Sequence, residues 1–236
     1  MIKIFIGYDP RETVAYHVLS QSLLEQSSVP LSITPVNRKN MWGVFTRERG
    51  PKESTEFSIS RFMVPAMIGY YNGHVLFMDC DMLCRGDIAE LFALARTDTA
   101  VQVVKHNYAP STDIKFLGQE QTKYKYKNWS SVMLFNCGHC DTKHLTQEYV
   151  NKAPGLDLHQ FKWCDEERIG ELPRQWNHLV GEYPYDPDAK IVHFTVGGPY
   201  FAEYENCDYS EEWFDCYRRT KHCDQLPVPR LKVSQR

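Results

Sequence analysis

At 236 residues the chain is long enough for one sizeable domain, and its 42% hydrophobic content supplies a core, which excludes disorder as the default state. A net charge of −3 and a pI near 6.3 speak against a general nucleic-acid-binding protein. No stretch approaches the roughly 20 apolar residues that span a bilayer, and the N-terminus lacks the features of a signal peptide. We therefore expect a cytoplasmic protein.

The chain begins with two predicted strands and a helix between them. The apolar run at residues 2–7 predicts a buried strand followed by a turn, and apolar residues at helical spacing predict a helix at 13–26. Residues 31–36 predict a second strand, which Pro35 interrupts. This order is typical of the start of an α/β domain.

Strands and helices continue to alternate along the rest of the chain. Residues 57–71 predict a helix, which Pro65 should kink or end. Further strands are predicted at 75–78, 100–104, 132–135 and 190–194, and further helices at 88–94 and 211–220. Because these strands are apolar on both faces, we expect an α/β fold with a mixed, mostly parallel sheet flanked by helices. One domain at 1–205 is the simplest account, with 206–236 forming a C-terminal helix and basic tail that pack on it or trail from it.

Two carboxylates follow the predicted strand at 75–78. Asp79 and Asp81 are two residues apart, so they share one face if the strand persists that far. Carboxylates held so close repel each other unless a cation neutralises them, and Mn²⁺ or Mg²⁺ suits such oxygen ligands and a diphosphate. The alternative is a turn in which the aspartates cap backbone amides.

The surroundings of this pair resemble the family 8 glycosyltransferases, which have the GT-A fold. The apolar strand and Asp79-Cys80-Asp81 are followed by Gly86-Asp87-Ile88 and Glu90-Leu91, as in that family. The similarity is greatest to bacterial members whose substrates are not assigned. It implies a nucleotide-diphospho-sugar transferase domain in which Asp79, Cys80 and Asp81 meet the metal and the sugar nucleotide.

The resemblance extends to both sides of the pair. It implies that Arg61, four residues before Pro65, faces the donor diphosphate, and that His193 is the third protein ligand of the metal. Gly198 stands where the family has a phosphate-gripping lysine, so the backbone N–H groups of Gly197 and Gly198 are expected to replace it.

Three residues after the first strand occupy the family's nucleoside position. Gly7, Tyr8 and Asp9 are assigned to it by the resemblance, with Tyr8 stacking on the base and Asp9 accepting from base or ribose. A plain turn in which Asp9 caps the following helix remains the alternative.

An acidic pair is assigned to the reacting carbon. Asp165 and Glu166 resemble the family's Asp-Gln pair, which lies beside the anomeric carbon in these configuration-retaining enzymes. A carboxylate at Glu166 could stabilise an oxocarbenium-like transition state or attack as a nucleophile. A solvated acidic helix start is the structural alternative.

Together these residues predict a hexosyltransferase that moves a sugar from a nucleotide diphosphate donor, UDP-linked, to a glycan or glycolipid acceptor, without nucleic-acid partners. Rival interpretations are a sugar-phosphate nucleotidyltransferase and a nucleotide-sugar-binding or glycan-binding module without turnover. The nucleotidyltransferase should carry a Gly-rich basic loop after the first strand, and residues 7–11 are not one.

Three other features carry weaker signals. The eight cysteines are expected to be reduced, and Cys137-Gly138-His139-Cys140 matches a disulfide-exchange motif without a thioredoxin context. Zinc bound by Cys137, His139, Cys140 and His144 is a related possibility. Basic and aromatic residues at 105–129 suit an anionic acceptor, and the basic C-terminal tail suits weak peripheral membrane contact.

Overall fold

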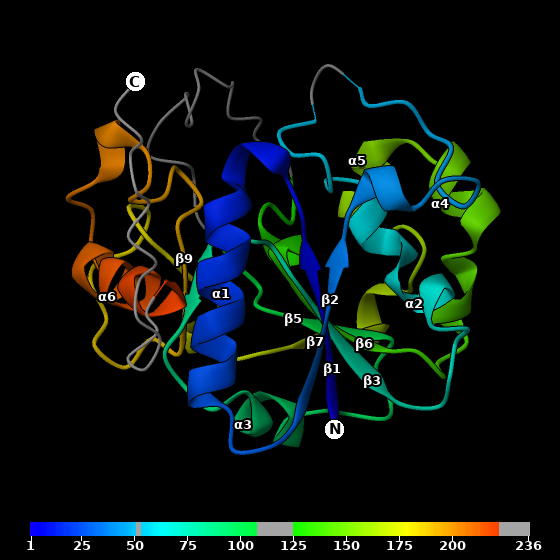
Figure 1. The fold of residues 1–236 in the computed structure, drawn as a ribbon. Helices are drawn as coiled ribbons and strands as arrows, with labels where there is room; N and C mark the ends of the chain where they lie inside the picture. The colour runs from blue at the N-terminus through cyan, green and yellow to red at the C-terminus, as the bar shows by residue number, and fades with distance from the viewer. Residues whose placement is uncertain (51–52, 108–124, 222–236) are drawn as a thin grey trace, which may run out of the picture.

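The computed structural model describes residues 1–50, 53–107 and 125–221, and its centre is a six-stranded sheet (Figure 1). The strand order is β2-β1-β3-β6-β5-β7, and a smaller sheet has the order β4-β9-β8. The strands are β1 (Ile2–Gly7), β2 (Leu31–Val36), β3 (His74–Met78), β4 (Met82–Cys84), β5 (Val101–Val103), β6 (Val132–Asn136), β7 (Ile169–Glu171), β8 (His178–Leu179) and β9 (Ile191–His193). The helices are α1 (Thr13–Gln26), α2 (Val64–Met67), α3 (Ile88–Ala93), α4 (Gln147–Lys152), α5 (Gly155–His159) and α6 (Ser210–Thr220). The predicted mixed, mostly parallel α/β architecture is confirmed.

The direction of each strand decides which loops can meet. β1, β2 and β3 run parallel, so the segments that follow them lie at one edge of the sheet, the carboxyl edge of β3. β6 runs antiparallel to both β3 and β5, whereas β7 runs parallel to β5. β6 therefore starts at the carboxyl edge of β3, and β7 starts at the opposite edge.

The predicted helix at 57–71 is much shorter in the structure. A 3₁₀ turn at Ser60–Met63 leads into α2, which ends at Met67. Pro65 lies in the first turn of α2, where its missing N–H costs nothing. Gly69 and Tyr70 then take positive φ angles of 68° and 51°, which ends the helix. The broken helix leaves Arg61 in a tight turn beside the end of β3.

Helices lie on both sides of the central sheet, with α1 and α6 on one side and α2, α4 and α5 on the other (Figure 1). α6 packs against α1, where the Arg219 guanidinium binds the Glu25 carboxylate at 2.7 Å and Trp213 is buried. The C-terminal helix thus belongs to the same packed unit, and the tail at 222–236 lies outside the described residues. Within the described part of the chain, no helix is long and apolar enough to cross a membrane.

Candidate metal and donor site

The two aspartates and the histidine that the sequence singles out lie together at the carboxyl edge of β3. The Asp79 N–H donates to the Ser131 carbonyl at 2.9 Å, which extends the pairing of β3 with β6 by one residue. In the small sheet Met82 of β4 pairs with His193 of β9, so the imidazole lies beside Asp81. His193 Nε2 is 3.4 Å from Asp81 Oδ1, and ligand atoms of Asp79, Asp81 and His193 all lie within 4.8 Å of one another. The three side chains fit a divalent cation with oxygen and imidazole ligands.

Asn177 fixes the orientation of the His193 ring. Its side-chain N–H donates to Ser131 Oγ at 2.8 Å, so its amide oxygen is the atom that faces His193 Nδ1 at 3.1 Å. Nδ1 therefore donates to this amide oxygen, and Nε2 is the ring nitrogen that faces Asp81 and is placed to bind a cation. Asn177 is fully buried, and no role was assigned to it from the sequence. A single amide gives no recognisable signal without its partner.

Arg61 supplies a buried positive charge to this group. It is 5% exposed, its Nη1 lies 2.8 Å from Asp79 Oδ1, and the same nitrogen donates to the Ser130 carbonyl at 2.9 Å. Its guanidinium stands 5.2 Å from the ring centroids of both Phe57 and Phe77. Arg61 thus offsets part of the negative charge of the aspartates at the carboxyl edge of β3, and its contact with a diphosphate stays a prediction.

Glu12 is a buried carboxyl group that the sequence did not single out. It is 1% exposed, and the Tyr200 hydroxyl donates to Glu12 Oε1 at 2.6 Å. Burial, followed by the negative charge of Asp81, raises the pKa of Glu12 to about 8. The contact ties the turn after β1 to the segment after β9, the two segments assigned to the donor.

Replacing Glu12 with glutamine is expected to remove a pH dependence of stability. Glu12 keeps its proton in the folded protein up to pH near 8 but loses it above its ordinary pKa of 4.5 when unfolded, so its contribution falls as pH rises between these values. At pH 9 in EDTA, E12Q should therefore unfold roughly 5 °C or more above wild type, with little difference at pH 4. Thermal unfolding followed across this range measures the effect, and parallel profiles for the two proteins would contradict the buried, protonated state.

Gly7, Tyr8 and Asp9, which the sequence assigns to the nucleoside, already make contacts within the protein. Asp9 is fully buried and accepts from the backbone N–H and side chain of Arg11. Burial by itself would raise the pKa of Asp9, but these bonds hold it below its usual value. The Tyr8 hydroxyl lies 3.2 Å from Thr13 Oγ1, and a Cβ on Gly7 would meet the Phe57 ring at 2.4 Å. Asp9 thus caps the turn, as in the structural alternative, and its contact with a nucleoside stays a prediction.

The glycines after β9 are required by close packing. A Cβ on Gly197 would lie 2.2 Å from the Tyr204 ring, and one on Gly198 would lie 2.2 Å from the Tyr200 ring. Their backbone contacts to phosphate stay a prediction. Cys80 is fully buried in the core, and burial raises the pKa of its thiol, so its side chain is a packing group.

Asp165 and Glu166 are not brought to this group. They precede β7 and therefore lie at the sheet edge opposite Asp79, where the Asp165 N–H donates to Asp141 Oδ2 at 3.1 Å. The Glu166 side chain is 73% exposed and accepts from the Tyr126 hydroxyl at 2.6 Å. This bond and then Lys125 lower the pKa of Glu166. The placement does not favour the role at the reacting carbon that the sequence predicts.

His159, which no sequence signal identified, lies close to the buried arginine instead. Its Nδ1 is 2.8 Å from Ser130 Oγ, on the residue whose carbonyl accepts from Arg61. Burial and then the charge of Arg61 lower the pKa of His159 to about 3, so the ring is neutral. The predicted acceptor surface cannot be placed in full, because 108–124 lie outside the described residues.

The sequence and the fold both match known glycosyltransferases. A family model described as glycosyl transferase family 8 matches residues 17–197. Protein CDI of Arabidopsis thaliana is 43% identical over 220 residues, which cover 90% of this chain and 85% of that protein.

Solved structures share the fold at low sequence identity. The bifunctional glycosyltransferase WbbM has a TM-score of 0.68 at 15% identity, over 93% of this chain and 50% of that one, so this chain spans half the length of WbbM. The galactosyltransferase LgtC, solved with donor and acceptor sugar analogues, has a TM-score of 0.60 at 12% identity over 95% and 98% of the two chains. The fold is therefore the GT-A-like fold of these enzymes, and the chain belongs to glycosyl transferase family 8 and is a glycosyltransferase.

Proposed function

We propose that this protein transfers a hexose from a UDP-linked sugar to a glycan or glycolipid acceptor in a reaction that depends on Mn²⁺ or Mg²⁺. The observation that carries the proposal is the group of Asp79, Asp81 and His193, whose ligand atoms lie within 4.8 Å of one another at the carboxyl edge of β3. This edge is where open α/β sheets bind their ligands. When bound, the ion would neutralise the departing diphosphate as a Lewis acid.

The side chains around the ion site have separate tasks. His193 is held by Asn177 with its Nε2 toward the site, and Arg61 adds a fixed positive charge beside Asp79. Because both groups are buried and hydrogen-bonded before the donor arrives, little reorganisation is needed to stabilise the leaving group. The nucleoside is assigned to Tyr8 and Asp9 and the phosphates to the backbone of Gly197 and Gly198. The basic C-terminal tail would make weak contact with a membrane surface.

Ligand-induced stabilisation of the full chain tests the donor and the metal together. UDP and UDP-hexoses should raise the unfolding temperature in Mn²⁺ and not in EDTA, since binding at 100 times the Kd adds about 2.7 kcal/mol to stability. GDP and ADP are the matched controls. If no nucleoside diphosphate stabilised the protein in Mn²⁺, the proposed donor site would be wrong.

Retention of the anomeric configuration is proposed from the family resemblance. Slow hydrolysis of an α-linked UDP-hexose, followed by proton NMR, should first release the α-anomer of the free sugar. Early release of the β-anomer would contradict retention.

Glu166→Gln tests the role of the acidic pair at the reacting carbon. Because Glu166 is exposed at the opposite sheet edge, we expect E166Q to keep donor turnover within about threefold of wild type. Steady-state hydrolysis of the donor measures this, with E166A as the second variant. A loss of about 100-fold or more in both would restore the carboxylate to the reacting carbon.

A further inference from the structure

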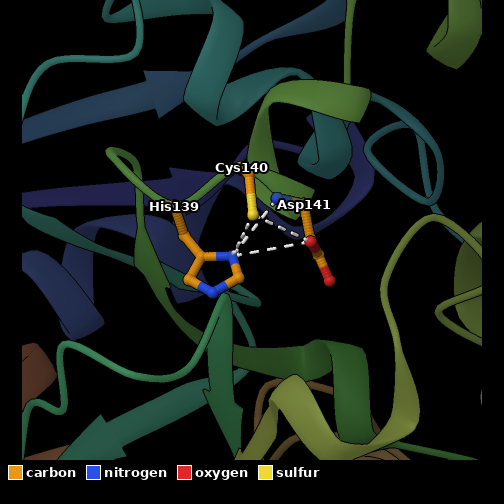
Figure 2. A group of neighbouring side chains, drawn as sticks. All are labelled: His139, Cys140 and Asp141. Carbon is orange, nitrogen blue, oxygen red and sulfur yellow. Dashed lines mark hydrogen bonds and ion pairs between the residues drawn. The ribbon is translucent and has the colours of Figure 1, made fainter.

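A second group of potential metal ligands lies beyond the end of β6, away from the donor site. His139, Cys140 and Asp141 are consecutive, and their side chains converge on one point (Figure 2). Cys140 Sγ lies 3.8 Å from His139 Nδ1 and 3.3 Å from Asp141 Oδ1, and Nδ1 lies 3.8 Å from Oδ1. A tetrahedral zinc site with ordinary bond lengths separates its ligand atoms by roughly 3.4–3.6 Å. The three atoms already stand within a few tenths of an ångström of that spacing.

A candidate fourth ligand comes from a distant part of the sequence. The Cys164 thiol donates to the Asp165 carbonyl at 3.3 Å, and Asp141 and Cys140 are among its electrostatic neighbours. The Asp165 N–H donates to Asp141 Oδ2 at 3.1 Å, while Oδ1 is turned to Cys140. Cys164 therefore stands next to the other three residues, and its thiol has to turn from the Asp165 carbonyl to join them at an ion.

The group is accessible from solvent and distinct from the zinc set suggested by the sequence. Cys140 is exposed, and Cys164 lines a surface pocket of about 270 Å³. Cys137 is fully buried beside Lys3 and Tyr71, and His144 Nδ1 lies 3.0 Å from the Trp163 carbonyl. Asp141 and Cys164 thus take the places predicted for Cys137 and His144. The burial of Cys137 also removes the basis for a disulfide-exchange pair with Cys140.

We propose that His139, Cys140, Asp141 and Cys164 form a second metal site that binds Zn²⁺ or a similar thiophilic cation. Thiolates favour such an ion, whereas the carboxylate-rich donor site favours Mn²⁺ or Mg²⁺. The Nδ1 lone pair accepts from the Asp141 N–H at 3.2 Å, and metal binding replaces this hydrogen bond. The bound ion joins the segment after β6 to the segment that leads into β7, and so fixes the loop of Asp165 and Glu166.

Cobalt is a direct probe because its spectrum reports thiolate ligands. In the full chain, reduced and stripped of metal with a chelator, Co²⁺ should give tetrahedral visible bands and a sulfur-to-metal charge-transfer band of the intensity of one thiolate-bound ion per chain, and Zn²⁺ should displace that ion. C140S and C164S should each lose the charge-transfer intensity. C207S, which alters a half-buried cysteine in another segment, should keep it. Circular dichroism and thermal unfolding establish that each variant is folded.

The proposals of the donor site and of this second site can be contradicted independently of each other. Asp81→Asn should leave the cobalt–thiolate spectrum unchanged, since Asp81 belongs only to the donor site. Absence of a charge-transfer band in the wild-type protein, or its persistence in folded C140S or C164S, would overturn the four-ligand site. A Cys140–Cys164 disulfide that survives reduction and coincides with no metal uptake, seen by mass spectrometry, would also overturn it.

Discussion

Replacing Asp81 with asparagine is expected to abolish metal-dependent donor binding while the protein stays folded. Asparagine has nearly the same shape but removes the charge beside His193 Nε2, at 3.4 Å, and with it a ligand for a hard cation. A bound ion contributes several kcal/mol of transition-state stabilisation, so donor turnover should fall by about 100-fold or more. Titration calorimetry of UDP with Mn²⁺, together with donor hydrolysis, measures both effects.

The control for this experiment is an aspartate that lies outside both proposed metal sites. Asp98 is exposed and pairs with Arg96 at 2.6 Å, so Asp98→Asn should leave UDP binding unchanged. Metal-free unfolding of the Asp81 variant should stay close to that of wild type. Manganese-dependent UDP binding that survives in the Asp81 variant would remove that residue from the metal site.

Truncating Arg61 to alanine is expected to cost stability as well as donor affinity. The side chain is 5% exposed and its Nη1 bridges Asp79 Oδ1 and the Ser130 carbonyl, so its loss leaves a nearly buried carboxylate without its countercharge. Breaking such a pair by removing one partner costs about 3–5 kcal/mol. Denaturant unfolding of the metal-free protein should show this loss in the free energy of unfolding.

Two further variants separate the contribution of burial from that of charge. Arg96→Ala breaks an exposed pair with a side chain that is 57% accessible, so it should cost at most about 1 kcal/mol. Arg61→Lys keeps the charge but cannot reproduce the planar contact between Phe57 and Phe77, and it should fall between wild type and Arg61→Ala. Added Mn²⁺ should recover part of the loss in R61A by neutralising Asp79. A loss in R61A no larger than that in R96A would contradict the buried pair.

Local sequence patterns were sufficient where a residue's role depends on its own segment. The apolar strand that ends at Met78 is visible in the sequence because burial on both faces requires an unbroken apolar run. The strand end in turn placed Asp79 and Asp81 at a ligand-binding edge, and the resemblance added Arg61 and His193, which the fold brings beside them.

Roles that depend on how distant segments pair could not be predicted from local patterns. β6 is as apolar as a buried parallel strand, so its composition does not show that it runs antiparallel to β3. That reversal, with the parallel course of β7, brings Asp165 and Glu166 to the start of β7 rather than to the end of β3, and their role at the reacting carbon stays a prediction. β4 and β8 are three and two residues long, too short to show alternation, yet their pairing with β9 brings His193 to Asp81.

The fold class, the family and the carboxylate pair after β3 can all be predicted without coordinates, because burial and motif spacing are properties of single segments. The contacts of Asn177 with His193, of Glu12 with Tyr200 and of Cys164 with the Asp141 segment appear only in the folded chain. Each of these contacts joins residues whose separation along the chain exceeds any local period. Their meeting depends on strand order and direction, which follow from packing of the whole core.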